Sequence, residues 1–144
     1  MAKKTSSVRD VRAWRVCVAF LVAPAVGGTL LALLWFTMIA YQPPHIVGVD
    51  TGAIFRRIVV ICWLAAYAMA VPLGGLAYFA LKSFRSWLVW TVTGSLIAAL
   101  PFLGNVGSAF IGLDIVIATL LAGGVAGYTF WAILEWAPWV GHAE

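Results

Sequence analysis

The stretch LDIVIATLLAGGVAGYTFWAIL, residues 113–134, decides the fold of this chain. Its only charged side chain is Asp114, at the beginning, and almost all the other residues are apolar or small. A helix needs about 20 mostly apolar residues to cross the roughly 30 Å hydrocarbon core of a bilayer. The stretch therefore predicts a membrane-spanning helix that begins near Leu113.

Three further stretches have the same character. They comprise residues 16–41, 58–81 and 87–104, and none of them contains a charged side chain. The first of them is not a signal peptide in this interpretation, because its apolar run of about 25 residues exceeds the 7–15 residues of a signal core. The sequence thus predicts an all-α integral membrane protein, a four-helix transmembrane bundle that forms a single domain over residues 1–144.

The composition supports a membrane protein and excludes several classes. Hydrophobic residues make up 64% of the 144 residues and charged residues 10%, and the mean hydropathy is +1.03. A soluble domain has about 45–50% apolar and about 25% charged residues. Because small domains bury the smallest fraction of their surface, this chain could not hide so much apolar area from water. A soluble enzyme, a nucleic-acid-binding domain and a disordered tail are therefore excluded.

Basic residues predict the orientation of the chain. Five of the nine Lys and Arg residues lie in residues 1–15: Lys3, Lys4, Arg9, Arg12 and Arg15. We expect them to contact anionic lipid headgroups, on a short amphipathic helix along the inner leaflet or on a frayed tail. With Lys82 and Arg85, seven basic residues lie on this side, against Arg56 and Arg57 on the other. The positive-inside rule then places both termini in the cytoplasm, and we expect a bacterial inner (plasma) membrane.

Aromatic residues are expected at the two membrane interfaces, because Trp and Tyr rings are apolar with one polar end. Those expected at the cytoplasmic interface are Trp14, Trp87, Trp90, Trp131, Trp136 and Trp139. Tyr41 and Trp63 are expected at the outer interface. Pro24 and Pro72 lie inside the first two spans and predict kinks, because each removes a backbone hydrogen bond.

Small residues predict where helices pack. Gly123 and Gly127 are four residues apart in the fourth span, as are Gly94 and Ala98 in the third. In lipid, such pairs let helix backbones approach closely. Two interpretations stay open: this face packs the helices of one chain together, or the Gly123/Gly127 face binds another subunit.

Polar residues are scarce and are expected at the outer face. The candidate polar site consists of Asp114, Asn105, Ser108, His45 and Asp50. Asp114 either stabilises the positive end of the last helix or forms a proton or cation site with Asn105 and Ser108 of the preceding loop. Asp50 or Thr51 is expected to cap the second helix, and Asp50 is expected to pair with Arg56 and Arg57. The spacing of His45 and Asp50 matches no metal motif, so no metal is predicted.

No catalytic or cofactor motif accompanies these features. Cys17 and Cys62 form no CxxC motif and are expected on opposite sides of the bilayer as inert thiols. Neither histidine lies in a predicted span, which excludes haem held by paired intramembrane histidines. We therefore expect a protein without cofactors that is not an enzyme.

The expected function follows from these absences. It is that of an accessory or stabilising subunit, or a partner-binding protein, in a membrane assembly. The alternative is a small homo-oligomeric transporter or pore. The expected partners are the lipid bilayer and another membrane protein or a second copy of the chain, and not nucleic acid.

Overall fold

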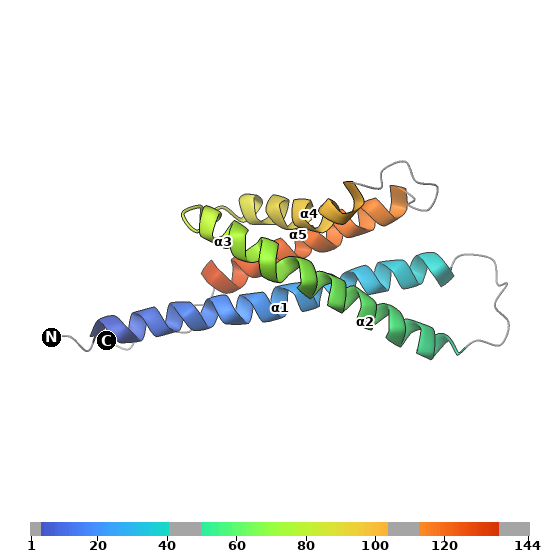
Figure 1. Ribbon diagram of the computed structural model, residues 1–144, viewed down its shortest axis with the longest axis horizontal. Coiled ribbons are helices and arrows are strands. Elements are labelled where there is room, and N and C mark those ends of the chain that lie inside the picture. The colour runs from blue at the N-terminus through green and yellow to red at the C-terminus, as the bar shows by residue number, and fades with distance from the viewer. Residues whose placement is uncertain (1–3, 41–49, 104–112, 136–144) are drawn as a thin grey trace.

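The structure is a computed structural model in which the described residues, 4–40, 50–103 and 113–135, are almost entirely helical. The elements in chain order are α1 (Lys4–Ala40), α2 (Thr51–Met69), the π-helix η1 (Ala70–Gly74), α3 (Gly75–Leu81), α4 (Trp87–Leu103) and α5 (Leu113–Glu135). Because α2, η1 and α3 follow one another without a break, they form one long helix, which we call the arm. The described chain is thus a bundle of four helices (Figure 1), as the sequence predicts.

Three of these four helices are long and apolar enough to cross a membrane: Ala13–Met38 within α1, the arm Thr51–Leu81, and α5. The fourth, α4, has 17 residues. At about 1.5 Å per residue it rises about 25 Å, which is at the lower limit for a spanning helix. The prediction of four full-length spans therefore holds for three of the described helices, and α4 is the short one.

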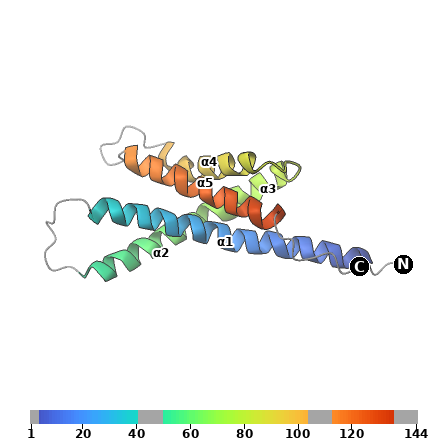
Figure 2. The same ribbon diagram turned by 180° about the vertical axis from the view of Figure 1, so that it is seen from behind.

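Helix α1 differs from the prediction at its beginning. It starts at Lys4 and continues to Ala40, 37 residues in all. The basic stretch from Lys4 onwards is therefore neither a separate surface helix nor a frayed tail, because it continues the spanning helix. Helix α1 also passes Pro24 without a break, and it projects beyond α3 and α5 at its N-terminal end (Figures 1 and 2).

The arm contains the deviation that a proline inside a helix predicts. Pro72 lies in η1. Proline has no N–H, so the usual bond to the carbonyl of Ala68 cannot form. The chain adopts a wider π turn there, a common site of bending in helices. The structure thus has a π-helical turn at Pro72, where the sequence predicts a kink.

Helix α5 is central to the packing. It contacts both α4 and α1 along much of its length, whereas α2 packs on α1 and touches α4 only slightly. The N-terminal end of α1, the turn between α3 and α4, and the C-terminal end of α5 all lie toward the same end of the bundle (Figures 1 and 2).

Four rings close the bundle near this end and form what we call the aromatic cluster: Phe20, Tyr78, Trp90 and Phe130. The rings of Phe20 and Phe130 are 5.0 Å apart and those of Trp90 and Phe130 5.2 Å. The rings of Tyr78 and Trp90 are 6.4 Å apart. Since these residues come from α1, α3, α4 and α5, the cluster joins all four helices.

Three tryptophans of the predicted interfacial belts donate their indole N–H within the protein. Trp90 is buried and donates to the carbonyl of Phe84 at 3.1 Å. Trp63, about 18 Å from the first residue of the arm, donates to the Thr29 hydroxyl at 3.0 Å, and Trp131 donates to the Arg85 carbonyl at 2.8 Å. Their position at the membrane interfaces stays a prediction. Trp136, Trp139 and Tyr41 lie outside the described residues.

Candidate functional site

Two residues of the predicted polar site, Asp50 and Asp114, lie among the described residues. His45, Asn105 and Ser108 lie outside the described residues. Asp50 precedes α2, and Asp114 lies in the first turn of α5. These two helix starts are at the same end of the bundle but on opposite sides, with the end of α1 between them in both views (Figures 1 and 2).

Of the two predicted N-cap residues, Asp50 and Thr51, Asp50 caps α2. Its carboxylate accepts a hydrogen bond from the Gly52 N–H at 2.9 Å, which satisfies one of the free donors of the first turn. Arg56 donates its Nε–H to the Gly52 carbonyl at 3.3 Å, and among the described residues Asp50 forms no ion pair with Arg56 or Arg57. Asp114 is exposed at the start of α5, where the helix dipole favours a carboxylate. Among the described residues, no three His, Cys, Asp or Glu side chains lie close enough to hold a metal.

The predicted packing residues meet in the contact between α4 and α5. A Cβ atom added to Gly94 would lie 2.9 Å from the Gly127 Cα, and one added to Gly123 would lie 2.5 Å from the Ala98 Cβ. The Ser95 hydroxyl also donates to the Leu120 carbonyl at 2.9 Å. The main chains of α4 and α5 are thus in direct contact, and the Gly123/Gly127 face leaves no room for the helix of another subunit.

Two adjacent glycines of α1 pack against two different helices. A Cβ atom on Gly27 would lie 2.9 Å from the Ala126 Cβ of α5, and one on Gly28 would lie 2.9 Å from the Trp63 Cδ1 of α2. Successive residues of a helix point about 100° apart. Helix α1 therefore holds α5 and the arm on two different faces.

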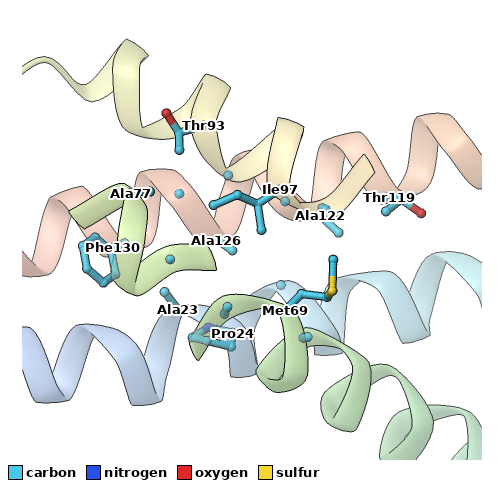
Figure 3. A pocket seen from close by; sticks show the side chains of 18 of the residues that line it. Ala23, Pro24, Met69, Ala77, Thr93, Ile97, Thr119, Ala122, Ala126 and Phe130 are labelled. Carbon is cyan, nitrogen blue, oxygen red and sulfur yellow. The ribbon is translucent and has the colours of Figure 1, made fainter. Parts of the chain in front are cut away.

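A cavity of about 260 Å³ lies between the arm and the other three helices (Figure 3). Of its 23 lining residues, 13 are Gly or Ala, and none carries a charge. Its hydroxyl-bearing lining residues are Thr93 and Thr119, and both hydroxyl oxygens point away from the middle of the cavity (Figure 3). The Thr119 hydroxyl donates to the Ile115 carbonyl within its own helix at 2.7 Å. The cavity offers neither an acid nor a base, and it suits apolar groups.

The cavity exists because the arm is held against α1 and at its end, but makes few contacts with the middle of α4 and α5. Near its middle the arm is held against α1 by Trp63, which packs on Gly28 and bonds to Thr29. Towards its end it is held by Tyr78 in the aromatic cluster. Between these anchors, Tyr67 donates its hydroxyl to the Leu21 carbonyl of α1. The mostly small side chains that residues 65–77 present to the cavity make few contacts with α4 and α5.

The sequence contains a signal for this cavity that our reading of the motifs missed. Ala66, Ala70 and Gly74 follow one another at intervals of four residues on the arm, and all three line the cavity. The small-residue pairs named above lie in the third and fourth spans and not in this one. Spacing alone would still have predicted close helix packing here, which the structure does not show.

Comparison with protein-family models, with curated proteins and with solved structures gave no match for this chain. The function is therefore argued from the charge, packing and cavity of the described residues.

Proposed function

We propose that this chain is a non-catalytic multi-pass membrane protein that acts by binding, as an accessory or stabilising subunit of a membrane assembly. The observation that carries the proposal is the sparse packing of the arm. In its most apolar window 11% of residues are buried, against 33% in α1 and 39% in α5. Helices in a membrane are held together by side-chain packing, so the arm leaves most of its surface free for a partner.

The outer surface of the arm is suited to an apolar partner helix. Leu64, Leu76 and Phe79 are 67%, 69% and 70% exposed. Small cavity-lining residues occupy the other side of the same helix. We propose that the partner is another membrane protein and that it packs against this outer surface.

The proposed orientation has both termini in the cytoplasm, in a bacterial inner membrane. Its support is that the basic start of α1 lies at the same end of the bundle as the turn that carries Lys82 and Arg85 (Figure 1). Basic residues at one end favour the cytoplasmic side.

The alternative, a homo-oligomeric transporter or pore, has less support. Its expected interface, the Gly123/Gly127 face, is occupied by α4. A path for ions or polar solutes needs polar lining groups, and no charged residue lines the cavity between the described helices. Its remaining support is Asp114, exposed at the start of α5.

The test uses a photoreactive amino acid placed at Leu76 or Phe79 in the native membrane. The matched control positions are Leu121 of α5 and Leu21 of α1, which are 56% and 62% exposed but lie off the arm. We expect crosslinks from the arm to one other membrane protein in stoichiometric amount, and only lipid adducts from the control positions.

A flux assay in liposomes separates the two functions. The subunit proposal predicts that Asp114→Asn leaves the crosslinked complex intact. Solute flux through the purified protein that is abolished by Asp114→Asn, together with arm crosslinks to lipid alone, would overturn the subunit proposal and favour the transporter.

A further inference from the structure

We infer that the cavity beneath the arm binds one hydrocarbon chain of a membrane phospholipid. This inference does not depend on the proposed partner function, because the cavity lies on the inner side of the arm and the partner surface on its outer side. Its grounds are the chemistry of the lining, the size of the space and the two anchors that hold it open.

The lining chemistry excludes polar occupants. The cavity has no charged lining residue, and the hydroxyls of Thr93 and Thr119 point away from it (Figure 3). Among the described residues, no buried side-chain N or O atom lacks a hydrogen-bond partner. A polar ligand would lose its own hydrogen bonds there without replacement. Water needs two to four polar partners, which these walls do not provide.

The size of the cavity, about 260 Å³, suits a lipid chain. An apolar cavity of about 150 Å³ holds the six carbons of benzene. By the same proportion, this cavity holds about ten carbons of an extended hydrocarbon chain.

The two anchors explain why the helices do not close the space. Closing it would move the arm towards α4 and α5. That movement would separate Trp63 from Gly28 and Thr29 at one anchor, and Tyr78 from Phe20 and Trp90 at the other. An unfilled space costs the lining atoms their dispersion contacts. Lipid chains are the apolar molecules that surround the bundle in a membrane, and they require no polar group at the site.

The experiment measures retained lipid by native mass spectrometry. The full-length protein is reconstituted in nanodiscs of phosphatidylcholine and phosphatidylglycerol, then transferred to a mild detergent. We expect the wild-type chain to retain one phospholipid molecule. Ala66→Leu and Ala77→Leu fill the cavity from two positions of its lining. Each added side chain displaces about three carbons of the bound chain, so retention should fall by about tenfold or more.

The control variants come from the same arm. Ala68→Leu and Ala80→Leu make the same change at exposed positions that do not line the cavity, and they should retain lipid as the wild type does. Where Leu prevents folding, Ala66→Val fills less space and keeps the comparison decisive.

Two results would overturn the inference. A wild-type protein that retains no lipid would show that the cavity closes or is filled by the chain itself. Equal retention by Ala66→Leu, Ala77→Leu and the two controls would place the bound lipid elsewhere on the surface. Neither result bears on crosslinking from the outer side of the arm, so the proposed function and this inference fail independently.

Discussion

Replacing Gly94 by alanine tests whether the main chains of α4 and α5 are in contact. The added Cβ atom would lie 2.9 Å from both the Cα and the N atom of Gly127, and closer still to the Gly123 carbonyl oxygen. Carbon atoms prefer separations of about 3.5–4.0 Å. Because the opposing atoms belong to the backbone, they cannot rotate away. We expect the two helices to move apart by about 1 Å.

The expected cost has two parts. Inserting a methyl group into a close-packed contact costs about 1–3 kcal/mol. A shift of about 1 Å would also stretch the 2.9 Å hydrogen bond from Ser95 to Leu120 beyond bonding distance. Hydrogen bonds between membrane helices contribute about 0.6 kcal/mol on average and up to about 1.7 kcal/mol. Gly94→Ala should therefore lower the free energy of unfolding by about 2–4 kcal/mol.

The assay is equilibrium unfolding in mixed micelles with increasing sodium dodecyl sulfate, followed by tryptophan fluorescence and circular dichroism. The matched control is Gly75→Ala, because a Cβ atom on Gly75 would meet no atom within 4 Å. That variant should be as stable as the wild type or more stable by up to about 1 kcal/mol, through helix propensity. If Gly94→Ala unfolds at the same dodecyl sulfate concentration as Gly75→Ala, the two helices are not in contact at these glycines.

Three further predictions concern the rest of the bundle. A double-mutant cycle with Thr29→Val and Trp63→Phe should give a coupling energy of about 0.6–1.7 kcal/mol, because these side chains share a hydrogen bond. A coupling energy of zero would argue against this anchor of the arm. Asp50→Ala should lower the free energy of unfolding by about 0.5–2 kcal/mol through loss of the N-cap, whereas Asp50→Asn should change it little. Equal effects of the two variants in the same unfolding assay would contradict capping by Asp50. N-ethylmaleimide should modify the exposed Cys17 in the folded protein and the buried Cys62 only after unfolding. Peptide mass spectrometry measures both reactions. Equal rates of modification at Cys17 and Cys62 in the folded protein would contradict the packing of α2 on α1.

The polar groups of this chain fall into two kinds with different consequences for function. Most hydroxyls inside the bundle donate to a carbonyl one turn earlier, as Thr119 does to Ile115. They are therefore satisfied within their own helix and do not indicate a ligand site. Trp63 and Ser95 instead bond across helices and fix their positions. This distribution supports a protein that acts through shape and apolar contact, and it directs attention to the two sides of the arm.

The sequence by itself determined the helical membrane architecture. In lipid, every backbone polar group must find its partner within the protein, and a helix satisfies all of them within one segment. Apolar stretches of about 20 residues therefore form helices whatever their neighbours. Local chemistry also determined the cap at Asp50 and the irregular turn at Pro72, because both depend on residues within one or two turns.

Only the tertiary structure decided which surfaces meet. Hydropathy gives all the apolar faces of a spanning helix the same character, since lipid chains are as apolar as leucine. It therefore could not show that Gly127 faces α4, that Gly28 faces Trp63, or that Trp90 is buried in the bundle. Nor could it show that the small residues of the arm border an open space. That space depends on two distant anchors, Trp63 and the aromatic cluster, and contacts between distant residues are settled only when the helices pack.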